Sequence, residues 1–146
     1  MARVNYFDIE TTLEDILKDD PTLAGTTILV EEELTFQQDD IVIIYLDRRV
    51  APANEQSLSA GKRTRMDLSF SIWCFHYGLE LRDVMKARDD LLGKIEIVLM
   101  NNRTLRDKVE TSWLEGGEFQ TLKTEDQAFM SGAEIVLTTK VIATTD

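Results

Sequence analysis

Residues 65–102 decide the fold, and they read RMDLSFSIWCFHYGLELRDVMKARDDLLGKIEIVLMNN. The first part alternates with a period of two, which predicts a strand that is half-polar at its start and apolar on both faces near its end. After Gly78 the apolar residues recur at helical spacing: Leu81, Val84, Met85, Leu91, Leu92, Ile95, Val98 and Leu99. Because almost no chain separates the two elements, we expect the strand and the helix to pack against one another.

Residues 94–100 fit either a helix or a strand. Their β-branched content favours a strand, and Gly93 costs about 1 kcal/mol relative to Ala inside a helix. The apolar stripe nevertheless continues across Gly93, and Asp90 with Lys94 forms a favourable i,i+4 pair. We therefore predict one continuous helix that stops near residues 101–102.

The predicted fold class is α+β, with a mainly antiparallel sheet, two helices packed on one face and a long projecting β-hairpin. The hairpin arm covers about residues 46–66, and residues 1–146 form a single domain. A first helix is predicted over residues 5–19, before Pro21. The predicted strands are 26–34, 41–50, 62–77, 109–114, 119–123 (a weak pairing) and 133–144.

The composition excludes several classes of protein. The net charge of −11 argues against a general nucleic-acid binder, because neutralising phosphates needs a basic surface. No apolar run is long enough to span a membrane, and the N-terminus lacks the apolar core of a signal peptide, so we expect a soluble protein made in a cytoplasm. The one cysteine, Cys74, lies in an apolar strand and is expected to be buried and inert.

The residues of catalytic chemistry do not form a recognisable site in the sequence. His76 is the one histidine, and its place in an apolar strand favours a structural role. One His and one Cys make a zinc site improbable, and no glycine spacing fits a phosphate loop. The carboxylates at 31–33, 39–40, 89–90 and 125–126 do not converge by spacing. We therefore predict no catalytic, cofactor-binding or metal-ligating residue, with a small acidic metal-dependent enzyme as the alternative.

The hairpin carries an uneven distribution of charge. Five basic residues stand between positions 48 and 65 against a single acid, Glu55: Arg48, Arg49, Lys62, Arg63 and Arg65. These five charges have two interpretations. In the first, they lie on a strand edge and at the hairpin tip and only keep a long hairpin soluble. Alternatively, a basic arm contacts an acidic surface, most simply that of another copy, and head-to-tail contacts of this kind produce rings or filaments.

The order of elements resembles the tail terminator (tail completion, or head–tail joining) proteins of tailed bacteriophages. The resemblance covers roughly residues 6–144: a leading helix, a two-strand arm with a long loop, the strand DLSFSIWCFHY, the helix LELRDVMKARDDLLGKIEIVL and a terminal strand. It includes the R-D-x-L-L helix sequence at residues 88–92. The family has no residue-level motif, so the five basic residues are candidate contacts from charge placement alone.

This resemblance implies a non-enzymatic structural protein of the virion, without a cofactor. Members typically form a hexameric ring that caps the tail tube and joins it to the head or neck. The implied partners are other copies of the chain, the tail tube protein and the head–tail connector or neck proteins, with no membrane. DNA would pass through the ring without being specifically bound. The implied location is the tail or neck of the virion, assembled in the host cytoplasm, and another neck or minor tail component is the alternative.

Overall fold

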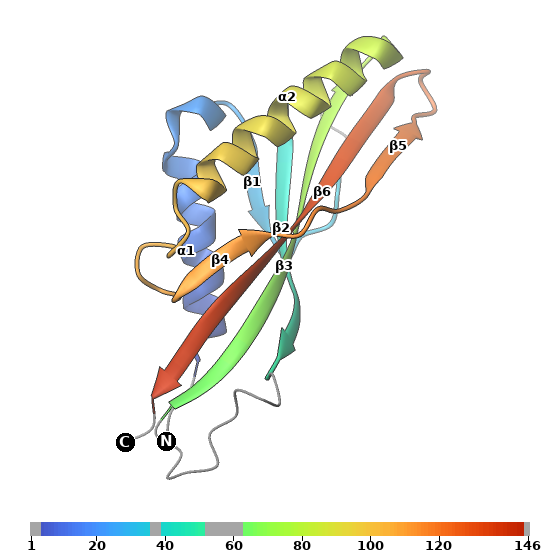
Figure 1. Cartoon of the computed structure of the whole chain (residues 1–146). Coiled ribbons are helices and arrows are strands. Elements are labelled where there is room, and N and C mark those ends of the chain that lie inside the picture. Colours follow the sequence, from blue (N-terminus) through green and yellow to red (C-terminus); the bar gives the residue numbers. More distant parts are fainter. Residues whose placement is uncertain (1–3, 36–38, 52–62, 145–146) are drawn as a thin grey trace.

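The computed structural model describes residues 4–35, 39–51 and 63–144. It has two α-helices, one short 3₁₀ helix and a six-stranded sheet, as Figure 1 shows, so the predicted α+β class is confirmed. The elements in chain order are α1 (Tyr6–Asp19), η1 (Pro21–Leu23), β1 (Thr27–Val30), β2 (Ile41–Val50), β3 (Arg63–Gly78), α2 (Leu81–Met100), β4 (Thr111–Leu114), β5 (Phe119–Lys123) and β6 (Phe129–Thr144).

Helix α1 begins and ends where its capping residues predict. The Asn5 side chain accepts a hydrogen bond from the Asp8 backbone N–H at 3.0 Å, which satisfies one of the free donors of the first turn. At the other end, Asp20 leaves the helical conformation and accepts from the Thr22 N–H at 2.9 Å, while Pro21 begins the 3₁₀ turn.

Helix α2 is continuous through Gly93, which confirms the prediction of one helix over residues 94–100. The buried residues of this helix recur every three or four positions: Val84, Arg88, Leu91, Ile95, Val98 and Leu99. Burial of this stripe outweighs the cost of one helical glycine. Among the described residues, no helix is both long enough and apolar enough to cross a membrane.

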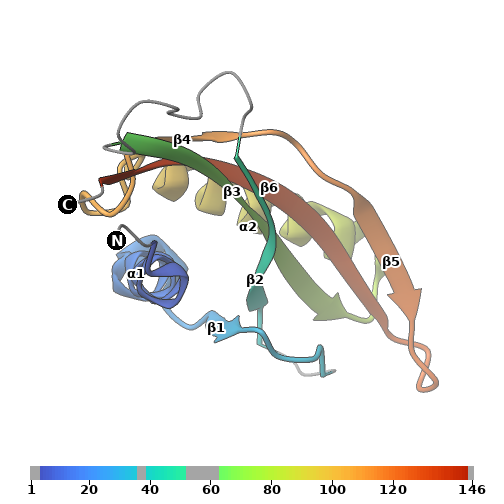
Figure 2. The ribbon, with the colours of Figure 1, turned by 90° about the horizontal axis from the view of Figure 1, so that it is seen from below.

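The sheet has the strand order β1-β2-β3-β6-β4, and β5 also pairs with β6. The β1–β2 pair is parallel and the other pairs are antiparallel. Strands β3 and β6 are paired over their whole length, from Arg63↔Thr144 to Gly78↔Phe129, and Figure 2 shows how strongly they bend. Strands β4 and β5 lie one after the other along the remaining edge of β6.

The main core joins both helices to alternate residues of the sheet. It contains Leu13 and Leu17 of α1, Ile95 and Leu99 of α2, and the alternating strand residues Val42, Ile44, Leu68, Phe70, Ile72 and Cys74. A second cluster contains the intervening strand residues Ile41, Ile43 and Phe75 with Met130. Trp73 stacks on Phe75 beside this cluster, with ring centroids 5.7 Å apart.

Candidate functional site

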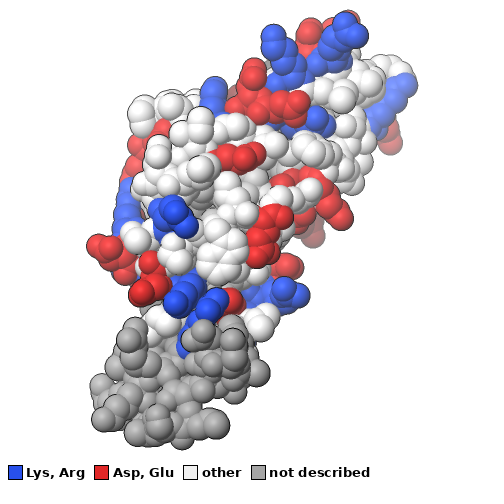
Figure 3. Space-filling view, in the orientation of Figure 1, with Lys and Arg blue, Asp and Glu red and all other residues white. Residues whose placement is uncertain are grey.

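Four of the five predicted basic residues lie in strands, and Lys62 lies outside the described residues. Arg48 and Arg49 are exposed near the end of β2. Arg63 and Arg65 belong to β3, where Arg63 pairs with Thr144. The antiparallel β2–β3 pairing predicted from the sequence is present, and Arg48 lies opposite Ser69. We call this part of the sheet the basic end, and Figure 3 shows positive side chains gathered next to the grey residues there.

Arg49 is held by helix α1. Its Nη1 donates a hydrogen bond to the Tyr6 hydroxyl at 3.0 Å, and its guanidinium lies 5.7 Å from the centre of the Tyr6 ring. Its strand partner, Leu68, belongs to the main core, so Arg49 is on the same side of the sheet as α1. Strand pairing therefore separates Arg48 and Arg49 onto opposite faces.

Arg65 is paired within its own strand. Its Nε and Nη2 donate to the two carboxylate oxygens of Asp67, at 2.8 and 3.0 Å. Asp67 lies just beyond residues 48–65, the stretch in which the sequence has five basic residues and a single acid. Arg48, in contrast, has no recorded ion-pair or hydrogen-bond partner for its side chain among the described residues, and it is exposed.

Sequence reasoning did not find Arg88, a buried arginine on α2. Only 7% of it is exposed, and its Nη1 donates to the Ser131 hydroxyl of β6 at 2.9 Å. Its Nε and Nη2 both donate to Asp89. The guanidinium lies 4.6 Å from the centre of the Phe119 ring on β5. The signal was present in the sequence, because Arg88 occupies a core position of the helical stripe between Val84 and Leu91.

Phe119 borders a hollow of about 180 Å³, which we call the edge pocket, between α2 and the strand edge. Strand β6 also lines this pocket, with Glu134 and Ile135. The other lining residues come from α2 and from the chain between β4 and β5: Leu92, Glu96, Leu114, Gly116, Gly117 and Phe119. Phe119 remains 62% exposed although Arg88 stacks on it. The side chain of Glu96 has no recorded hydrogen-bond or ion-pair partner among the described residues.

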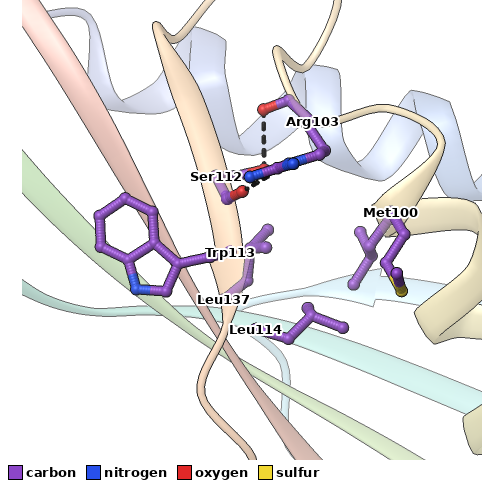
Figure 4. Close-up of a pocket in the computed structure, with 7 residues that line it drawn as sticks. Met100, Arg103, Ser112, Trp113, Leu114 and Leu137 are labelled. Atoms are coloured by element: carbon purple, nitrogen blue, oxygen red, sulfur yellow. Dashed lines mark hydrogen bonds between the residues drawn. The ribbon is translucent and has the colours of Figure 1, made fainter.

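A second hollow of about 320 Å³ lies beside the edge pocket, and Leu114 lines both. Figure 4 shows Trp113 and Met100 around it, with Arg103 and Ser112 joined by hydrogen bonds. The Ser112 hydroxyl donates to the Arg103 carbonyl at 2.7 Å, and the Arg103 Nε donates to the Ser112 carbonyl at 3.2 Å. These bonds fix the chain after α2 against β4.

Two carboxyl groups meet where α1 lies against β1 and β2. Glu10 is 5% exposed, and its Oε2 has no hydrogen-bond partner among the described residues. Glu31 follows β1 with a left-handed backbone (φ 55°), and its Oε1 accepts from the Leu46 N–H at 2.7 Å. Burial, followed by the hydrogen bond and charge of Glu31, raises the pKa of Glu10 to about 7.

His76 has the kind of structural contact that its sequence position favours. Its Nδ1 lies 2.6 Å from Oδ1 of Asp40, whose backbone carbonyl accepts from the Thr27 N–H at the start of β1. In the described part of the chain, no three His, Cys, Asp or Glu residues are grouped so that they could hold a metal ion. Cys74 is fully buried, and burial raises the pKa of its thiol to about 12.

Comparison with models of known protein families and with curated proteins gave no match to this chain.

Proposed function

We propose that this chain is a non-enzymatic structural protein of a tailed-phage virion, a tail terminator whose ring caps the tail tube and joins it to the head or neck. The order of elements supports this proposal: α1 leads, the antiparallel β2–β3 pair follows, α2 comes directly after β3, and the long β6 comes last among the described elements. This is the order on which the resemblance to the tail terminator family is based.

The observation that carries the proposal is the presence of two unlike surfaces on one subunit. The basic end lies where β2 stops, at the bottom of Figure 1. The edge pocket lies between α2, the chain from Leu114 to Phe119, and β6. Exposed apolar side chains border the two hollows: Phe119 borders the edge pocket and Met100 the second hollow. Such exposure is typical of an interaction surface. Contacts between unlike surfaces repeat from one copy to the next and close into a ring when the rotation allows it.

The proposal includes the finer architecture of the subunit. In it, α1 and α2 cover one face of the sheet and leave the other for neighbours, and the hairpin of β2 and β3 extends the basic end outward. The shared core of both helices with one alternating set of strand residues supports the first part. The extension of the hairpin is supported by the β2–β3 pairing, which continues as far as Val50↔Asp67. Strand β6 also pairs with β3 over this region.

Solution mass tests the proposal against the enzyme alternative. Native mass spectrometry and analytical ultracentrifugation of the full chain should give a concentration-dependent assembly of about six copies, and negative-stain electron microscopy should show rings. Incubation with assembled tubes of the tail tube protein from the same phage should place the protein at tube ends. A monomer at all concentrations that binds Mg²⁺ or Mn²⁺ tightly would overturn the proposal and favour the small acidic metal-dependent enzyme.

The basic arm has a separate test within this proposal. Replacing Arg48, Arg49, Lys62, Arg63 and Arg65 together by Ser should abolish ring formation and leave thermal unfolding cooperative. Lys86→Ser with Lys94→Ser removes two exposed charges of α2 and is the control that should still assemble. A ring that forms unchanged after all five replacements would show that the arm is not a contact between subunits.

A further inference from the structure

The edge pocket combines the three features that bind an arginine side chain. Leu92 and Leu114 provide apolar walls for the aliphatic stem, and Phe119 provides an aromatic ring. Glu96 provides a carboxylate that has no recorded partner among the described residues. Gly116 and Gly117 form part of the wall without side chains, which leaves the pocket open to solvent.

The aromatic ring of this pocket is fixed before anything binds. Arg88 stacks on Phe119 and is itself held by Ser131 and Asp89, so the ring has a defined position although most of it is exposed. A fixed ring loses little conformational entropy when a partner binds to it. Phe119 is therefore a preorganised anchor on the surface.

The surroundings of the pocket are acidic. Residues 109–122 contain Glu110, Glu115 and Glu118 and no Lys or Arg. Glu115 accepts a hydrogen bond from the Trp113 indole N–H at 2.9 Å, which holds one carboxylate at the sheet edge. Strands β4 and β5 pair with β6 and, within the described residues, with no other strand. A positively charged segment is the complementary occupant of this edge.

Among the predicted basic residues whose side chains are described, Arg48 fits best as the occupant. Arg49 binds Tyr6 and Arg65 binds Asp67, whereas Arg48 is exposed and has no recorded partner within the described part of the chain. Val50 stands two residues further along the strand, on the same face, and is also exposed, so an apolar side chain accompanies the guanidinium.

We infer that the edge pocket binds the Arg48 side chain of a second copy of this chain. The Arg48 guanidinium pairs with Glu96 and stacks on Phe119, while Val50 contacts the apolar wall. The donor and the acceptor are two different surfaces of one subunit, so the contact is head-to-tail. This inference rests on the proposed ring and names the contact that builds it.

Charge exchange tests the pairing. Arg48→Glu and Glu96→Lys should each raise the concentration at half-assembly by about tenfold or more, measured by sedimentation velocity, because each places like charges at the contact. The double variant should restore assembly to within roughly threefold of the wild type. Lys94→Glu, an exposed change on α2, is the control and should leave assembly close to that of the wild type.

The outcomes separate this inference from the proposed function. If the wild type forms rings and Arg48→Glu or Glu96→Lys assembles equally well, the pairing is wrong and the ring stands. If both single variants stay monomeric and the double variant does too, the two residues do not meet, and the pairing is again wrong. A wild type that remains monomeric at all concentrations overturns the proposed function and this inference together.

Cysteine cross-linking gives a second measurement that does not depend on the energy of a charge pair. A disulfide joins Cα atoms no more than about 7 Å apart, which an Arg–Glu pair exceeds, so the thiols are joined by a short bismaleimide reagent instead of by oxidation. Mixed Arg48→Cys and Glu96→Cys chains should then give a cross-linked dimer. The native Cys74 is fully buried and gives little background. A mixture of Arg48→Cys and Lys94→Cys is the control. Equal yields from the two mixtures would overturn the inference.

Discussion

At the scale of single residues, the Glu10–Glu31 pair makes stability depend on pH. The raised pKa of Glu10 means that the folded protein keeps a proton which the unfolded chain loses above its ordinary pKa of 4.5. Between pH 4.5 and about 7 the folded state therefore binds more protons, and the free energy of unfolding falls as pH rises. Below pH 4.5, Glu10 is protonated in both the folded and the unfolded state and adds no pH dependence. Above about pH 7 it is charged in both states, and the full cost of burying that charge lowers the free energy of unfolding.

The substitution Glu10→Gln removes the free-energy cost of burying a charged carboxylate at this position. We expect the variant to be more stable than the wild type at pH 8 by about 1–3 kcal/mol, the range for a buried polar group without a partner. Near pH 4 the two proteins should have similar stability, because Glu10 is then protonated. Urea unfolding across this pH range is the measurement.

Asp15→Asn is the control on the exposed side of the same helix, and its stability relative to the wild type should not change in the same pH window. If the gain in stability of Glu10→Gln over the wild type is the same at pH 4 and pH 8, the raised pKa of Glu10 does not account for it. A variant less stable than the wild type at pH 8 would also contradict an explanation by the raised pKa.

At the scale of elements, β6 depends on a glycine opposite an aromatic ring. A Cβ at Gly132 would lie 2.4 Å from the Phe75 ring, which is buried in the second cluster. Gly132→Ala should therefore lower the free energy of unfolding by about 1–3 kcal/mol, the usual cost of overpacking. Thermal or urea unfolding measures the loss. Full stability in Gly132→Ala would show that Phe75 has room to move.

Gly93 provides the opposite case within α2. A Cβ at this position meets no atom within 4 Å, and the backbone is helical. Gly93→Ala should raise the free energy of unfolding by about 1 kcal/mol, because Ala is the better helix former. The same unfolding experiment serves both glycines. A destabilised Gly93→Ala would mean that the helix needs the glycine for close packing.

The sequence predicted the elements with strong periodicity and missed features that depend on tertiary contacts. Both helices and the β2–β3 pairing follow from apolar spacing and were predicted. The start of β6 was placed at residue 133, and it begins at Phe129. Ser131 and Gly132 are poor strand formers, but their small size admits Arg88 on one face and Phe75 on the other. Strand β1 ends at Val30 because Glu31 adopts a left-handed backbone, which no pattern indicated.

The residues of the candidate site also divide into those that a local pattern predicts and those that depend on tertiary contacts. Charge counting predicted Arg48 as a candidate contact, because the clustering of basic residues is visible in the sequence, and this stays a prediction. Charge counting did not show that Tyr6 and Asp67 hold Arg49 and Arg65, since those contacts depend on the strand register and on the position of α1. The edge pocket joins α2 to residues 114–119 and 134–135, so no local pattern reveals it.

At the scale of the whole molecule, the assembly of the proposed ring should be sensitive to salt. Raising the salt concentration from about 0.1 M to about 1 M shortens the screening length from about 10 Å to about 3 Å, which weakens contacts between exposed charges. The concentration at half-assembly should therefore rise, while the unfolding of the subunit remains cooperative. Sedimentation velocity at several salt concentrations checks this. Assembly that strengthens with salt would indicate a mainly apolar contact.

The long pairing of β3 with β6 also has a consequence for how the chain folds. Gly78 pairs with Phe129 and Arg63 with Thr144, so the longest strand pair of the sheet joins segments that are distant in the sequence. Contacts of this kind carry a large loop-closure cost and slow folding. During synthesis, β3 emerges from the ribosome well before β6 and exposes an apolar edge in the interval. We therefore expect the nascent chain to be prone to aggregation until β6 docks.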